Sequence, residues 1–178
     1  MNLKKDDPCA IFDNDFTELV STTSVRRKLT LAPTSSIQVY MASHTTFKKR
    51  RWGYRLTLPD RTIRRTGATP YAYTGPAMGI VVLIKALRHL RRLRLTHFPL
   101  TLTTNIKTVE LVLTHQRLAD WAAHDWPPTI ELGDLWQLAD AELRHFPAYT
   151  VQWAPDRYRR VDWLVKPTSP RRSQHHRR

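Results

Sequence analysis

The sequence predicts an α/β protein with a five-stranded mixed sheet flanked by helices. Segments with strand-like patterning are separated by segments whose apolar residues follow helical spacing. Their order is three strands, a helix, a strand, several helices, a strand and a last helix, which is typical of an α/β fold. A length of 178 residues suits about one domain, and 41% hydrophobic residues are enough to build its core.

The first three strands are expected over residues 37–41, 52–58 and 62–66, with Pro59 and Asp60 marking the turn between the last two. A loop over 68–75 follows. Pro76 suits the first position of a helix, where its missing N–H costs nothing. Apolar residues from Ile80 to Leu90 then recur at helical spacing and predict a helix that ends near Leu95.

The second half of the chain continues this pattern. A fourth strand is expected over 100–104 and helices over 108–113 and 117–124, before the break at Pro127 and Pro128. Gly133 opens a helix through Leu143, with Asp134 in its favourable first turn. A fifth strand over 149–153 and a closing helix over 159–165 complete a domain predicted as residues 36–166. Residues 1–35 are predicted to be a partly flexible extension and 167–178 a disordered basic tail.

Charge is distributed unevenly along the chain, whose formal net charge is +14. Residues 31–100 carry thirteen basic and one acidic side chain, whereas residues 101–165 carry six basic and nine acidic ones. Residues 166–178 add five basic residues and no acid. Such an excess of positive charge favours a polyanionic partner, and nucleic acid is the first expectation.

Several other classes of protein are excluded or disfavoured. The single cysteine, Cys9, excludes a disulfide framework and a zinc cluster built on thiolates. No apolar run approaches the roughly 20 residues that span a bilayer, and the N-terminus lacks a basic-then-apolar leader. We therefore expect no membrane association and a cytoplasmic location. The histidines are scattered, and the adjacent pair His175 and His176 in the tail indicates flexibility rather than a metal site.

Six features resemble the ribonuclease H family, in particular the bacterial type 1 enzymes. DLWQLADAELRHF at 134–146 is similar to the late helix DLWQxLDxxL, and VQW at 151–153 to the strand VxWxWV. IQVYMASH at 37–44 is similar to VxIYTDGS, AMGIVVLIKALRHL at 77–90 to RMELxAxxxALxxL, and TTNIKTV at 103–109 to TDSxYV. Trp121 and Trp126 resemble the tryptophans of the basic protrusion, or handle. The resemblance implies a ribonuclease H-like fold over about residues 36–166.

The family's chemistry makes the differences informative. Its members cleave the RNA strand of an RNA/DNA hybrid with two Mg²⁺ ions held by four carboxylates. At the matching positions this chain has Ala42, Gly79, Asn105 and Asp162, so that only the last carboxylate is kept. No shift of the alignment restores the others, because there is no acid between Val20 and Pro59 or between Arg61 and Val109.

The sequence therefore predicts a pseudoenzyme with no assigned catalytic residue and no cofactor, Mg²⁺ being relevant only to residual nuclease activity. The remaining acid, Asp162, has arginines at 157, 159 and 160 close by in sequence. A lone acid in such surroundings is more often an ion-pair or helix-cap residue than a metal ligand. We interpret Asp162 in that way.

Binding to nucleic acid is the function that we predict, with a hybrid or another duplex as ligand. Lys85, Arg88 and Arg92 are spaced to share one helix face, and the run 48–51 falls where the family has a Gly-rich loop. Thr74 keeps a family threonine, and Lys107 replaces a glutamine. The candidate residues are Lys48, Lys49, Arg50, Arg51, Arg64, Arg65, Thr74, Lys85, Arg88, Arg92, Lys107, Trp121 and Trp126.

Three alternatives remain open from the sequence. Trp121 and Trp126 could serve core packing instead of binding. The whole domain could be a protein-interaction module, whose basic face docks an acidic partner or the acidic region 101–165 of a second copy. Residual ribonuclease H activity is the third hypothesis.

Overall fold

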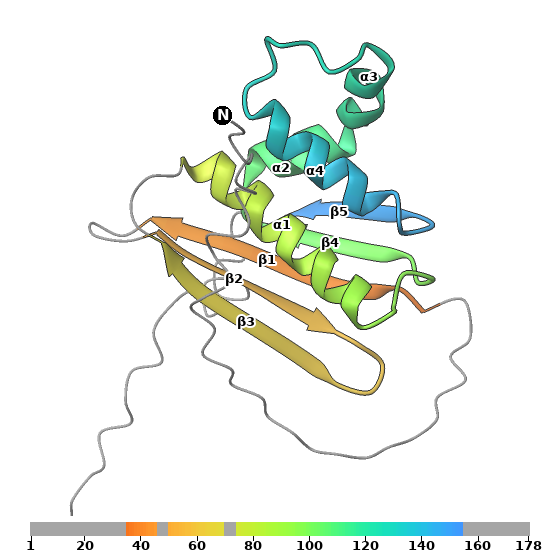
Figure 1. The fold of residues 1–178 in the computed structure, drawn as a ribbon. Helices are drawn as coiled ribbons and strands as arrows, with labels where there is room; N and C mark the ends of the chain where they lie inside the picture. The colour runs from red at the N-terminus through yellow and green to blue at the C-terminus, as the bar shows by residue number, and fades with distance from the viewer. Residues whose placement is uncertain (1–34, 46–49, 70–73, 155–178) are drawn as a thin grey trace, which may run out of the picture.

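In the computed structural model of the chain, residues 35–45, 50–69 and 74–154 are described. They form β1 (Ile37–Thr45), β2 (Arg50–Thr57), β3 (Thr62–Thr69), α1 (Gly75–Arg92), β4 (Leu100–Thr104), α2 (Lys107–Thr114), α3 (Arg117–Ala123), α4 (Gly133–Leu143) and β5 (Tyr149–Trp153) (Figure 1). The predicted order of strands and helices is confirmed over this part of the chain. The predicted N-terminal extension, closing helix and basic tail lie outside the described residues.

The five strands form one mixed sheet, as predicted, and their order in it is β3-β2-β1-β4-β5. The hairpins pair β1 with β2 and β2 with β3 antiparallel, whereas β4 runs parallel to both β1 and β5. β1 continues past the predicted end at Met41, because Ser43 and His44 pair with Trp52 and Arg51 of β2. Polar residues near a strand end give no periodic signal, so only the pairing partner reveals this extension.

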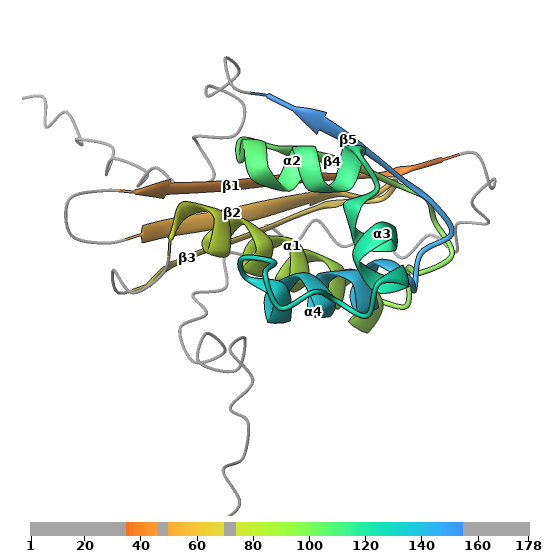
Figure 2. The ribbon, with the colours of Figure 1, turned by 90° about the horizontal axis from the view of Figure 1, so that it is seen from above.

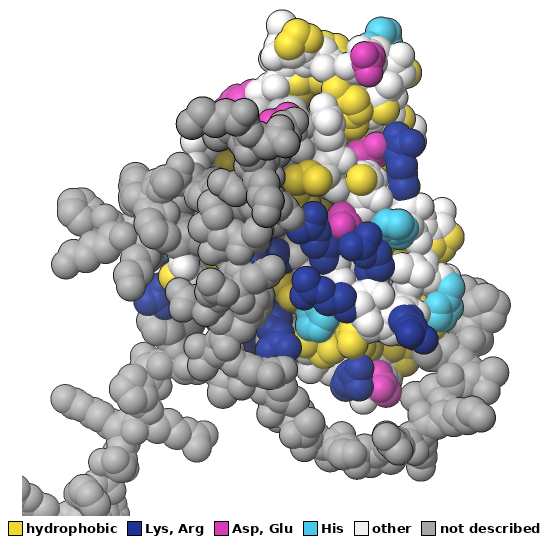
Figure 3. Space-filling view, in the orientation of Figure 1, with side chains coloured by type: hydrophobic (Ala, Val, Ile, Leu, Met, Phe, Trp, Pro, Cys, Tyr) yellow, Lys and Arg dark blue, Asp and Glu magenta, His cyan; other side chains and the backbone are white. Residues whose placement is uncertain are grey.

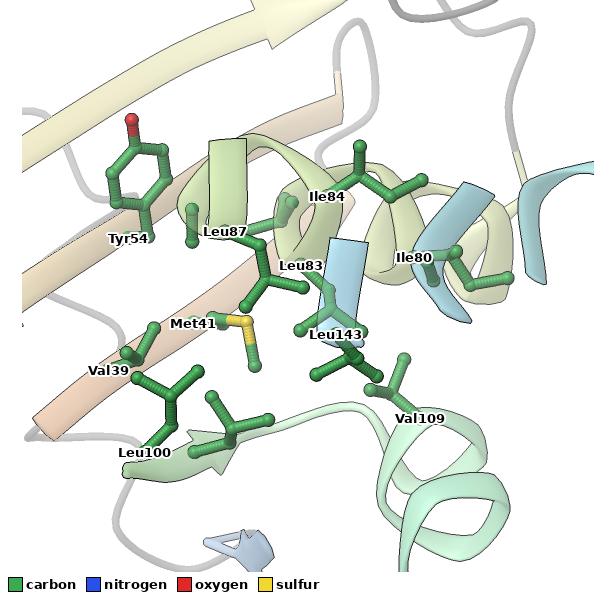
Figure 4. Close-up of a cluster of buried hydrophobic side chains, with 14 of the residues drawn as sticks. Val39, Met41, Tyr54, Ile80, Leu83, Ile84, Leu87, Leu100, Val109 and Leu143 are labelled. Carbon is green, nitrogen blue, oxygen red and sulfur yellow. The ribbon is translucent and has the colours of Figure 1, made fainter. Parts of the chain in front are cut away.

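The hydrophobic core lies between the helices and one face of the sheet. Val39, Met41, Tyr54 and Leu100 point from the strands towards Leu83 and Leu87 of α1, and Val109 of α2 and Leu143 of α4 close the same cluster (Figure 4). α1 lies along β1 and β2, and α4 packs against α1 (Figures 1 and 2). No helix within the described ranges is long and apolar enough to cross a membrane.

α1 connects β3 to β4 along the chain, and contacts of nearby residues define where it begins and ends. At the start, Thr74 Oγ1 accepts a hydrogen bond from the Ala77 N–H at 3.3 Å, and a proline follows in the first turn. The helix ends at Arg92, earlier than the predicted Leu95, because Arg94 adopts a left-handed backbone with φ of 57°. Eighteen residues give the helix a length of about 27 Å.

Candidate functional site

Two of the positions matched to the family's metal ligands lie where the parallel pairing of β1 with β4 ends. Met41 pairs with Thr104, so Ala42 and Asn105 follow in neighbouring positions. The Asn105 side chain donates from Nδ2 to the Ser43 carbonyl at 3.0 Å and accepts at Oδ1 from the Ser43 N–H at 3.2 Å. This amide therefore extends the pairing of the two strands by one residue, and both of its ends serve structure.

The third position, Gly79, faces the same end of the sheet from the first turns of α1. It is buried, and a Cβ built on it would lie 2.5 Å from Ile106 Cδ1 and 3.0 Å from Val109 Cγ2. The side chain of Ile106, the residue after Asn105, thus fills the space beside the helix backbone. Only glycine fits here without displacing Ile106. Ile106 was not identified from the sequence, because a single apolar residue after a strand carries no distinctive signal.

Ala42, Gly79 and Asn105 are thus brought to one end of the sheet, whereas Asp162 lies outside the described residues. The donor atoms at this end do not fit a pair of Mg²⁺ ions, which need several carboxylate oxygens. Two of the three residues have no side-chain oxygen, and the third uses its amide in the sheet. Within the described ranges, no three His, Cys, Asp or Glu residues come together in a way that could hold a metal ion.

The residues around this end have clear structural roles. Thr74, a binding candidate, caps α1 as described above. Lys107, another candidate, opens α2 and pairs with Glu110 at 2.7 Å. Its Nζ also lies 4.2 Å from the centroid of the Trp153 ring at the end of β5. Trp153 is 43% exposed, so the pair presents an aromatic ring and a cation to solvent near the end of β4.

The two handle tryptophans pack inward. The Trp121 ring lies 6.2 Å from that of Trp126 and 6.1 Å from that of Trp136, which is buried in the core. Both are partly buried against the core cluster. This arrangement agrees with the core-packing alternative.

The basic residues of α1 differ in what they contact. Lys85 is only 7% exposed, and its Nζ lies 5.2 Å from the Trp52 ring centroid. Arg88 Nε donates to Glu142 Oε1 of α4 at 3.0 Å, and Arg91 Nη1 lies 3.4 Å from Oε2 of the same buried carboxylate. Of the three predicted binding residues on this helix, only Arg92 is exposed. The shared helix face predicted for Lys85, Arg88 and Arg92 is therefore mostly turned towards other parts of the protein.

Arg64 and Arg65 lie in the middle of β3 and point to opposite faces of the sheet. Arg65 pairs with Tyr54 on the α1 side, whereas Arg64 pairs with Arg55, whose guanidinium lies 4.2 Å from the Tyr40 ring centroid. Neither is beside Arg51, whose partner on β3 is Ala68. Arg64 and Arg65 are therefore not the β3 partners of Arg51, the described end of the 48–51 run. Lys48, Lys49 and the side chain of Arg50 lie outside the described parts.

The pKa of the buried Tyr54 depends on the positive charges around it, on the face of the sheet that α1 covers. The Tyr54 hydroxyl hydrogen-bonds His89 Nδ1 at 2.9 Å. Burial raises the pKa of Tyr54 far above its ordinary value, while the positive charges of Arg65 and Arg92 oppose that rise. Burial also lowers the pKa of Arg64. Arg65, Arg92 and His89 therefore lie near one another around Tyr54. The sequence did not indicate this grouping, because Arg65 belongs to β3 and the other two residues to α1.

Figure 3 shows the consequence at the surface. Lys and Arg side chains gather over the C-terminal part of α1 and the neighbouring hairpin, with few acidic side chains among them. Over residues 35–100, the described chain has eleven basic residues and one acidic residue, Asp60. Asp60 itself lies 4.0 Å from Arg61. This side of the molecule is therefore strongly positive.

Known proteins resemble this chain in structure, although no family model and no curated protein sequence matches it. The ribonuclease H1 of the archaeon Halobacterium salinarum aligns with a TM-score of 0.53 and 18% identity, over 74% of this chain and 95% of that one. The N-terminal RNase H domain of Rv2228c from Mycobacterium tuberculosis gives 0.56 and 16%, over 74% and 96%. LC11-RNase H1, solved with an RNA/DNA hybrid, gives 0.56 and 16%, over 73% and 94%.

These similarities agree with the strand order and the helix positions above. At such identities they establish the fold and leave the activity open. Residues 35–154 of this chain, within their described ranges, have the ribonuclease H-like α/β fold.

Proposed function

We propose that this chain is a ribonuclease H-like domain that binds nucleic acid through its phosphate backbone and does not cleave it by the two-metal mechanism. The observation that carries the proposal is the charge of the part from β1 to the start of β4, residues 35–100, whose described residues include eleven basic side chains and a single acidic one. A folded surface with this excess attracts a polyanion at long range and releases counterions on binding.

The end of the sheet supports the second half of the proposal. Ile106 fills the space beside Gly79, and the Asn105 amide is hydrogen-bonded to the Ser43 backbone in β1. Neither Gly79 nor Asn105 can therefore offer a metal ligand without rearrangement. A single acid elsewhere could not offset the repulsion of two divalent cations. Binding therefore relies on direct contacts between basic side chains and phosphates.

A duplex is the first ligand to test, and an RNA/DNA hybrid is the natural choice, since LC11-RNase H1 was solved with one. Phosphate contacts carry no sequence information, so related duplexes of any sequence should bind alike. RNA/DNA hybrid, duplex RNA, duplex DNA and single strands of equal length would be titrated by fluorescence anisotropy in EDTA, over a range of salt concentrations.

The expected result is metal-independent binding that weakens steeply as salt rises. Labelled hybrid incubated with Mg²⁺ or Mn²⁺ should stay intact, and Asp162→Asn should behave like the wild type. Binding that is weak and equal for all ligands at low salt would contradict the binding function. Metal-dependent cleavage that Asp162→Asn abolishes would contradict the loss of catalysis.

A further inference from the structure

The C-terminal end of α1 lies about 27 Å from its N-terminal end, and hence far from Ala42, Gly79 and Asn105. Basic residues cluster at this distant end. Arg91 and Arg92 close the helix, Arg94 follows in the turn, and all three are exposed. Arg65 of β3 and His89 lie near Arg92 around Tyr54. We refer to Arg65, His89, Arg91, Arg92 and Arg94 as the α1-end surface.

A helix C-terminus favours one or two cations, because its free carbonyls carry partial negative charge. The α1-end surface has more than this explanation requires. Arg65 belongs to a strand, and Arg94 lies beyond the helix in a left-handed turn. Glu142 pairs with Arg91 of this surface and with Arg88 beside it, whereas Asp60 contacts Arg61. One carboxylate does not balance the four arginines of the surface, so a net positive charge is available to attract an external anion.

Glu142 also positions part of this surface. Its buried carboxylate contacts both Arg88 and Arg91, and Arg91 Nη1 donates to His145 Nε2 at 3.2 Å. One negative charge thus holds two guanidinium groups, and the Arg91 side chain is still 47% exposed. An arginine that is already held by neighbouring side chains loses less side-chain entropy when it binds a phosphate than a freely moving arginine does.

We propose that the α1-end surface is a phosphate-binding surface for duplex nucleic acid, separate from the end of the sheet that corresponds to the family's catalytic centre. This inference rests on the proposed function and adds a location to it. The guanidinium groups of Arg91, Arg92 and Arg94 donate to backbone phosphates, and His89 adds charge when it is protonated. The occupant is a duplex because its closely spaced phosphates match a cluster of cations gathered from two elements.

The test compares two charge reversals. Arg92→Glu changes the α1-end surface, and Arg117→Glu makes the same change at an exposed position of α3. Binding of a hybrid and of a DNA duplex is measured from low to moderate salt for both variants and the wild type. Thermal unfolding of each variant is followed alongside, so that a loss of binding is not confused with a loss of folding.

For Arg92→Glu we expect roughly a tenfold weaker affinity at low salt and a slope of log K against log salt that is smaller by about 1. Arg117→Glu should change the affinity less than about twofold, as expected of a side chain that makes no phosphate contact. Equal effects of the two reversals on a wild type that binds well would overturn the surface and leave the proposed function standing. Failure of the wild type to bind any nucleic acid would overturn both. Equally tight binding of poly-glutamate would reassign the surface to acidic polypeptides.

Discussion

The two halves of the described chain use charge in opposite ways. The described residues between 35 and 100 include eleven basic residues and one acid, whereas residues 101–154 have three basic residues and seven acids. In the second half, some of the acids pair with close neighbours in sequence, as in Lys107–Glu110 and Arg144–Asp140. Surface pairs of this kind contribute little to stability but neutralise charge locally. The first half has no such balance, and this is the excess of charge on which the proposed binding of nucleic acid rests.

Glu142 is the exception that joins the halves. It is buried, and its contacts with Arg88 and Arg91 link α4 to α1. From the sequence, the acidic region of one copy could have bound the basic region of another. The structure shows that part of this attraction acts within one molecule, between Glu142 and the two arginines of α1. The predictions below test whether the contrast between the halves comes from packing, from ion pairing or from electrostatics alone.

The largest effect on stability is expected when Gly79 of α1, which lies beside Ile106 and α2, is replaced by an acidic residue. Gly79→Glu must displace Ile106 and place a carboxylate among apolar side chains, so we expect a loss of at least about 4 kcal/mol in the free energy of unfolding. Urea denaturation followed by circular dichroism measures it. Gly79→Ala tests the packing alone, and its cost should fall when Ile106→Val removes the nearest methyl group. An unchanged cost in the double variant would contradict the close packing.

Breaking the link between the halves should have the next largest effect. Glu142→Ala leaves Arg88 without its buried partner, and we expect a loss of about 3 kcal/mol. Glu110→Ala breaks an exposed pair within the acidic half and should cost less than about 1 kcal/mol. Chemical denaturation of both variants gives the comparison. Similar costs would show that Glu142 is no more than another surface acid.

A smaller effect is expected where β1 meets β4. Asn105→Asp keeps the acceptor for the Ser43 N–H but loses the donor to the Ser43 carbonyl, so two oxygens then face each other. We expect a loss of about 1–2 kcal/mol at neutral pH. The loss should shrink at low pH, where the protonated carboxyl can donate again. A variant as stable as the wild type at neutral pH would mean that the amide does not hold the strands together.

The smallest effects concern two tyrosines, one in each half. Burial raises the pKa of both, but Arg65 and Arg92 oppose the rise at Tyr54, whereas Asp140 adds to it at Tyr149. We therefore expect Arg92→Gln to raise the pKa of Tyr54 further and Asp140→Asn to lower that of Tyr149. Titration by ultraviolet absorbance, with Tyr54→Phe and Tyr149→Phe to assign the signals, measures both. Shifts in the same direction would contradict the electrostatic contrast.

These raised pKa values also set a pH dependence of stability. In the unfolded chain a tyrosine loses its proton near pH 10, whereas the folded protein holds the Tyr54 and Tyr149 protons to higher pH. Above pH 10 the unfolded state binds fewer protons, so their contribution to stability falls as pH rises. Tyr54→Phe should weaken this fall when unfolding is followed across that range.

The sequence by itself determined the fold class, the element order and the imbalance of charge. Strand alternation, helical spacing and the turn at Pro59 and Asp60 are local signals, because each depends on neighbouring residues alone. β4 and β5 were predicted with their observed bounds. The resemblance of scattered motifs also placed Ala42, Gly79 and Asn105 at corresponding points of the family's fold, and the structure brings these three together. Cytoplasmic location and the absence of a cofactor remain predictions.

Only the tertiary structure decided what most of the candidate side chains do. Lys85 and Arg88 have the spacing of a binding face, yet one packs on Trp52 and the other pairs with Glu142. Ile106 closes the space beside Gly79 although the two residues belong to different elements. The residue type limits the contacts that a side chain can make. The residues that it contacts, however, come from distant parts of the chain. Burial and those partners, which exist only after folding, select which possibility is realised.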